Sequence, residues 1–150
     1  MAWGIISFGN YQGISIPQLV FKDPDYFFWA MENDVFNGTY LVLEAKDVYK
    51  KSRNIKIPKF GHKAEYVTYK GKFQDIKLVP IERPAHIGSS STFREDKIDM
   101  GFVRETKGYD KRGGEILIHS LKSILFGSSN YRMSKKRCED FFENPSNFTL

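Results

Sequence analysis

Turn-forming dipeptides recur along this 150-residue chain and divide it into short segments. Gly9-Asn10, Asn37-Gly38 and Lys70-Gly71 each have an aromatic residue within two positions on both sides, a pattern typical of chain reversals. No apolar run approaches the roughly 20 residues that a membrane-spanning helix needs. Such segments favour an α+β fold made mostly of antiparallel hairpins, with short N-terminal helices and a C-terminal helix packed on the sheet.

The size and composition of the chain favour a single domain over residues 1–150. Hydrophobic residues make up 41% of the chain, which is enough to form a core. A chain of 150 residues is too short to form a second independent core. Cys138 is the single cysteine, so it cannot form an intramolecular disulfide, and the chain starts without the features of a signal peptide. We therefore expect a cytoplasmic protein.

Capping residues predict where the helices begin. Ser15-Ile16-Pro17 and Asp23-Pro24-Asp25 each place a side-chain acceptor before a proline, the order found at helix N-termini. Apolar spacing predicts a helix over 115–126 that ends at Gly127, and a last helix over 135–143 begins after Ser134.

Alternating apolar residues and turn signals predict the strands. A hairpin is expected over residues 5–16, and Asn37-Gly38 predicts another whose second strand covers 40–45. A third pairs 65–69 with 73–81 across Lys70-Gly71. The remaining expectations are a loop over 82–92, a half-buried strand through 98, 100 and 102, and a turn-rich segment over 107–114.

The N-terminal residues 1–35 carry a recognisable motif. Residues 6–13 followed by 23–31 resemble a small module at the C-terminus of exodeoxyribonuclease X-like proteins, through Phe8, Gly9, Tyr11, Gly13, Asp23, Pro24, Tyr26 and Trp29. The resemblance implies an accessory module of DNA-processing proteins that also occurs in small stand-alone bacterial and phage proteins. It leaves residues 36–150 unassigned and does not include the catalytic exonuclease domain. Asn10 and Gln12 stand where the module often has lysine.

Cations and aromatic residues alternate in the middle of the chain. The whole chain has a net charge of +5. This segment is the candidate nucleic-acid site, because cations neutralise phosphates while tyrosine rings stack on bases. The competing interpretation is a lysine-rich sheet edge that prevents aggregation. The candidate residues are Lys46, Lys50, Lys51, Arg53, Lys56, Lys59, Lys63, Tyr66, Tyr69, Lys70 and Lys72.

These features lead us to expect a nucleic-acid-associated binding protein, with DNA as the partner, and no cofactor or catalytic residues. A first alternative is a phage or mobile-element protein that binds a host protein and inhibits or redirects it. A second is a metal-dependent nuclease, because Asp34, Glu44 and Lys46 follow the order of restriction-type nucleases. In the expected hairpin, however, Asp34 and Glu44 point to opposite faces. The histidines His62, His86 and His119 have no zinc-binding spacing.

Overall fold

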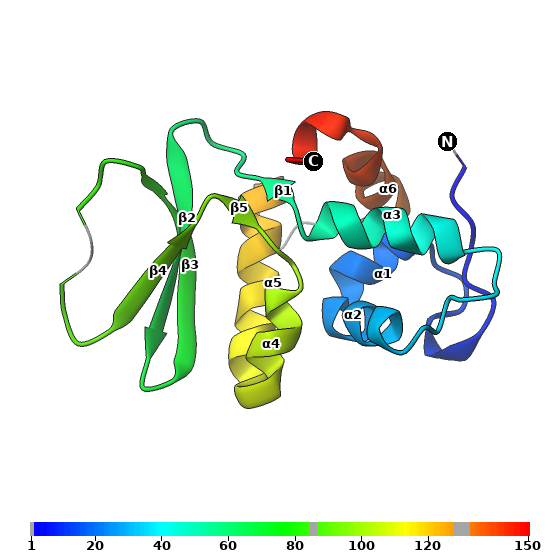
Figure 1. Ribbon diagram of the computed structural model, residues 1–150, viewed down its shortest axis with the longest axis horizontal. Coiled ribbons are helices and arrows are strands. Elements are labelled where there is room, and N and C mark those ends of the chain that lie inside the picture. Colours follow the sequence, from blue (N-terminus) through cyan, green and yellow to red (C-terminus); the bar gives the residue numbers. More distant parts are fainter. Residues whose placement is uncertain (1, 85–86, 128–132) are drawn as a thin grey trace.

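The computed structural model describes residues 2–84, 87–127 and 133–150, and it confirms the α+β class. Figure 1 shows three layers: a sheet, a pair of helices against it, and a group of helices built from the two ends of the chain and α3. The helices are α1 (Ile16–Lys22), α2 (Pro24–Glu32), α3 (Val42–Ser52), α4 (Phe102–Tyr109), α5 (Lys111–Phe126) and α6 (Lys135–Glu143). The strands are β1 (Ile55–Lys56), β2 (His62–Tyr69), β3 (Lys72–Pro80), β4 (Ser91–Glu95) and β5 (Lys97–Ile98). Short 3-10 helices cover Gly9–Tyr11 and Pro145–Asn147.

The helix starts follow the capping residues. Asp23 accepts a hydrogen bond from the backbone N–H of Tyr26 (3.0 Å) and so begins α2. Ser134 accepts one from the N–H of Arg137 (3.2 Å), which begins α6 where the sequence predicts it. Gly127 ends α5 in the left-handed conformation, at a φ of 86°.

The main sheet has the strand order β3-β2-β4, with both pairings antiparallel. Lys70 and Gly71 both have positive φ, 50° and 77°, as a tight turn between twisted strands requires, and this confirms the predicted third hairpin. The inner face carries Tyr66, Ile76 and Phe93 toward α4 and α5, so a C-terminal helix packs on the sheet as expected.

The hairpin predicted at Asn37-Gly38 is wrong. Gly38 does take a positive φ of 76°, but its turn connects helices, and the predicted strand over 40–45 is largely the start of α3. Leu41, Ala45 and Val48 are all fully buried, and their spacing places them on one face of a helix. Packing of this face against the N-terminal helices, including α1, outweighs the local turn signal.

Three further expectations need correction. Residues 5–16 form one bridge, between Ile5 and Ser15, instead of two full strands, because the 3-10 helix occupies the loop between them. The strand through 98, 100 and 102 ends at Ile98, where an Asp99 side chain accepts a hydrogen bond from the N–H of Gly101 (2.8 Å) and turns the chain into α4. Residues 107–114 are mostly helical, because Asp110 caps α5.

One apolar core joins the layers. Buried side chains from α1, α2, α3, α5, α6 and the sheet belong to a single cluster, whose largest members include Phe21, Phe27 and Phe142.

The loop expected over 82–92 has neither helix nor strand at 82–84 and 87–90, and it ends where β4 begins. Residues 85–86 of this loop lie outside the described part. Among the described residues, none of the helices is both long and apolar enough to cross a membrane.

Candidate nucleic-acid interface

The exposed side of α3 carries the first part of the basic segment. Lys46 and Lys50 are four residues apart and therefore lie on the same side of the helix, and both are exposed. Within the described residues, neither forms a salt bridge with a carboxylate. Both charges therefore remain available to an anion.

The small ribbon of β1 and β5 continues this surface past the end of α3 (Figure 1). Lys56 and Lys97 stand directly opposite each other in its register, so their side chains leave the ribbon on the same face. Lys97 donates to Asn54 Oδ1 (2.5 Å), and Lys56 is exposed. Like charges placed directly across a strand pair repel each other, and an anion bound between them would relieve that repulsion.

A hollow of about 260 Å³ lies where α3 meets β5, lined by Tyr49, Lys50, Arg53, Asn54, Lys97 and Asp99. Arg53 is held in place here. Its Nε lies 3.3 Å from Asp99 Oδ2, its Nη1 donates to the Tyr49 hydroxyl (2.9 Å), and Asp99 raises the pKa of its guanidinium. A fixed arginine between two lysines gives the hollow the donors that a phosphate group requires.

We call Lys46, Lys50, Arg53, Lys56 and Lys97 the α3–β1 basic surface. Four of its members come from the predicted basic segment, and Lys97 does not. Sequence reasoning missed Lys97 because it lies far along the chain, between Asp96 and Asp99 in a locally acidic stretch. Only the pairing of β5 with β1 brings it to the site.

The structure does not gather the other predicted residues at this surface. Lys51 pairs with Asp47 (3.0 Å) and also donates to the Phe142 carbonyl (3.1 Å), and Lys63 pairs with Asp96 (3.1 Å). Lys59 is exposed in the turn before β2. These cations therefore contribute less to a common anion site, since none of them lines the hollow.

The hairpin turn forms a separate basic end of the molecule. Tyr69, Lys70 and Lys72 lie at the far end of β2 from His62, roughly 23 Å away at about 3.3 Å per strand residue. Lys70 sits over the Tyr69 ring, 5.3 Å from its centre. Tyr66 is only 3% exposed and faces the inner side of the sheet. The eleven predicted residues therefore do not form one continuous binding surface.

The motif residues of the N-terminal segment come together on the surface of α2. The Tyr11 hydroxyl donates to the Asp23 carboxylate, and its ring lies 4.8 Å from that of Tyr26. Tyr26 in turn lies 5.6 Å from Trp29, which remains 40% exposed. Pro24 is the first residue of α2. This part of the motif thus builds the cap of α2 and a partly exposed row of rings.

The other motif residues shape the preceding loop. Gly9 and Gly13 have positive φ, 69° and 92°, which only glycine adopts without strain. Phe8 lies 6.1 Å from Phe36 at the edge of the core. No family model, curated protein or solved structure matches this chain. The resemblance to the exodeoxyribonuclease X-like module therefore stays a prediction that rests on these residues.

The two carboxylates of the nuclease alternative occupy different structural elements. Asp34 is in the turn after α2, at a positive φ of 55°, whereas Glu44 lies in the first turn of α3. Both carboxylate oxygens of Glu44 accept from the backbone N–H of Gly4, at 3.0 and 3.3 Å. Within residues 2–84, 87–127 and 133–150, histidine, cysteine and acidic side chains form no group suited to a metal ion, and His86 lies outside this part.

Proposed function

We propose that this protein binds nucleic acid through the α3–β1 basic surface. The observation that carries the proposal is the pairing of Lys56 with Lys97 beside the hollow that contains Lys50 and Arg53. These cations come from three elements and converge on a single region. Phosphates of a nucleic-acid backbone are ligands of the opposite charge.

The contacts we expect are mainly to the backbone. Arg53 is positioned to hold one phosphate by two N–H groups, since Asp99 and Tyr49 restrict its side chain. Lys50, Lys56 and Lys97 neutralise the neighbouring phosphates as point charges. Such contacts give affinity and orientation with little sequence preference. DNA is the first partner to test, because the N-terminal resemblance is to DNA-processing proteins.

Titration with short single- and double-stranded DNA tests this proposal with two matched double variants. Lys56→Gln/Lys97→Gln removes two charges from the α3–β1 basic surface, and Lys70→Gln/Lys72→Gln removes two from the distant hairpin turn. We expect a several-fold loss of affinity for the first variant and little change for the second. Equal affinities of the two variants would reject the proposed surface.

A second candidate function is binding to a protein partner, favoured by exposed apolar side chains at one end of the sheet. The Phe60 ring is fully exposed and Ile81 is 52% exposed, and the Ile81 N–H donates to the adjacent Gly61 carbonyl (2.9 Å). Exposed aromatic side chains often anchor interfaces. Capture from a nuclease-treated bacterial lysate would support this candidate if a protein is retained by the wild type and absent with Phe60→Ser.

A further inference from the structure

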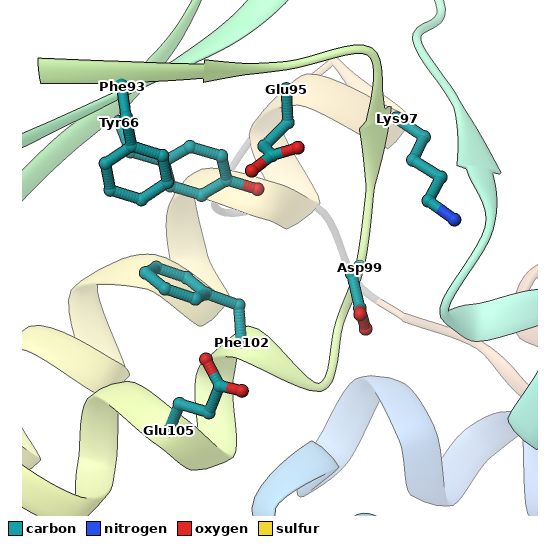
Figure 2. Close-up of a pocket in the computed structure, with 7 residues that line it drawn as sticks. All are labelled: Tyr66, Phe93, Glu95, Lys97, Asp99, Phe102 and Glu105. Carbon is teal, nitrogen blue, oxygen red and sulfur yellow. The ribbon is translucent and has the colours of Figure 1, made fainter.

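A pocket of about 190 Å³ lies between the inner face of the sheet and α4, next to the α3–β1 basic surface but of opposite charge. Figure 2 shows aromatic side chains on one side and carboxylates around the remaining wall. The lining residues are Tyr66, Phe93, Glu95, Lys97, Asp99, Phe102 and Glu105. Of these, only Lys97 also belongs to the α3–β1 basic surface.

Three rings form the apolar wall. Tyr66 and Phe93 are paired across β2 and β4, which stacks their rings 4.8 Å apart at 8°. Phe102, at the start of α4, meets both rings edge-on, with its centre 4.9 Å from that of Tyr66. Phe93 keeps 39% of its surface exposed. The wall is therefore rigid and still accessible from solvent.

The carboxylates supply an excess of negative charge. Asp99 is already engaged by the Gly101 N–H (2.8 Å) and by Arg53 (3.3 Å). Glu95 and Glu105 have neither a hydrogen bond nor a salt bridge from their side chains to any residue in the described part of the chain. Lys97 does not neutralise them, because its ammonium group donates to Asn54 and points away from the rings (Figure 2).

The Tyr66 hydroxyl is a second and independent sign of a ligand. Tyr66 is 3% exposed, and its hydroxyl points from the apolar wall toward the carboxylate side of the pocket (Figure 2). It makes no hydrogen bond to any described residue. The hydroxyl oxygen thus opens into the pocket although the ring behind it is buried, and it is free to accept a hydrogen bond from a group that enters from outside.

We propose that this pocket binds a guanidinium group. A guanidinium ion carries several N–H donors in one plane, so it can donate to the carboxylates and the Tyr66 oxygen that line the pocket while its flat face lies against an aromatic ring. A primary ammonium ion is more strongly hydrated and has no flat face to stack. A free phosphate or a nucleotide would be repelled by the carboxylates.

N-acetyl-arginine amide is the probe, and binding is followed by chemical-shift changes of the backbone amides of the full chain. We expect saturable shifts at the pocket residues, and much weaker ones with N-acetyl-lysine amide. The citrulline compound has nearly the same shape but no charge, and should not bind. Equal binding of the arginine and citrulline compounds, or no shifts at the pocket, would overturn the proposal.

Two substitutions connect binding to the pocket groups. Tyr66→Phe keeps the ring and removes only the unpartnered hydroxyl, so we expect weaker arginine binding without a loss of thermal stability. Glu95→Gln should weaken binding about tenfold, the loss expected when a charged hydrogen bond becomes neutral. Glu82→Gln removes an exposed carboxylate that does not line the pocket and serves as the control. Wild-type affinity in both pocket variants would contradict the assignment.

A short arginine-containing peptide identifies the source of the ligand. Tighter binding of the peptide than of the amino-acid compound would assign the pocket to an arginine side chain of a polypeptide, and the reverse order would assign it to a small molecule. Both results support a guanidinium site. The test is separate from the DNA titration, because Tyr66 and Glu95 do not belong to the α3–β1 basic surface.

Discussion

At the scale of single residues, Tyr11 couples the N-terminal loop to the start of α2. Its hydroxyl donates to Asp23, the residue that caps α2, and this hydrogen bond together with burial raises the pKa of Tyr11 to about 12. A phenol whose pKa is raised on folding stabilises the folded state fully below its ordinary pKa. The contribution is lost as the pH rises from about 10 to about 12.

Tyr11→Phe should therefore unfold at a lower urea concentration than the wild type at neutral pH. The difference in the free energy of unfolding should shrink between pH 10 and pH 12, since the wild-type hydroxyl ionises beside the Asp23 carboxylate. A difference that stays constant across this range would contradict the role given to the hydrogen bond.

The reactivity of the Cys138 thiol cannot be predicted from its neighbours in the sequence. Two neighbouring cations, Lys136 and Arg137, would lower the pKa of an exposed thiol, although a passive thiol on a helix is the expectation from sequence. In the structure the side chain is 1% exposed, and burial raises the pKa of Cys138 to about 11. Burial of a particular side chain depends on tertiary packing, which neighbours in sequence do not determine.

At the scale of elements, α5 depends on a glycine that packs tightly against its own cap. A Cβ at Gly113 would lie 2.2 Å from Asp110 Oδ2 and 3.0 Å from the Cβ of Phe73. That Asp110 oxygen accepts from the Phe73 N–H (3.1 Å), and the other accepts from the Gly113 N–H (2.9 Å). The carboxylate thus caps α5 and joins it to β3.

Gly113→Ala should lower the free energy of unfolding by about 1–2 kcal/mol, because the alanine displaces this cap. Gly108→Ala is the matched control within a helix, since a Cβ there meets nothing within 4 Å. That variant should gain up to about 1 kcal/mol from higher helix propensity. Urea unfolding measures both, and a stabilised Gly113→Ala protein would show that the close approach is relieved without cost.

The central strand of the sheet contributes a buried carboxylate to an ion pair with the neighbouring strand. Glu65 is 3% exposed and accepts from Arg94 Nε (2.9 Å), while Lys77 lies farther away at 3.9 Å. Arg94 also donates to the Arg83 and Pro84 carbonyls, at 2.8 and 3.1 Å. The pair therefore joins β2 and β4 to the segment that follows β3.

Removing the Glu65 carboxylate leaves Arg94 with its two carbonyl partners and partial contact with solvent. Glu65→Ala should therefore reduce the free energy of unfolding by about 1–3 kcal/mol, the range for the loss of a hydrogen bond to a charged group. Asp140→Ala breaks the exposed Lys136–Asp140 pair (2.8 Å) and should leave the free energy of unfolding nearly unchanged, because solvent screens both charges. Thermal or urea unfolding distinguishes the two, and a Glu65→Ala loss as small as the control's would show that the pair adds little.

Several elements follow from sequence alone, because their signals are local. The caps Asp23 and Ser134 fix helix starts, and Lys70-Gly71 fixes a hairpin whose strands are neighbours in the chain. Asn37-Gly38 fails as a hairpin signal because the burial of one α3 face decides that segment. Gly113 and Gly114 are turn signals in sequence, but in the structure they allow close packing of α5 on its neighbours.

At the scale of the whole molecule, two sites of opposite charge lie side by side. The hollow of the α3–β1 basic surface and the guanidinium pocket share Lys97 and Asp99 in their linings. Sequence predicts the cations of α3 because they are dense in one segment. It does not predict Lys97 or the pocket, since pairing of β5 with β1 and of β4 with β2 brings those residues together from distant positions.

The salt dependence of DNA affinity tests the central claim most directly. The logarithm of the association constant is measured against the logarithm of the salt concentration for the wild type and for Lys56→Gln/Lys97→Gln. Each phosphate of duplex DNA that the double variant no longer neutralises should reduce the slope by about 0.9, so we predict a clearly shallower slope for that variant. A wild-type affinity indifferent to salt, or identical slopes for both proteins, would contradict the proposed surface.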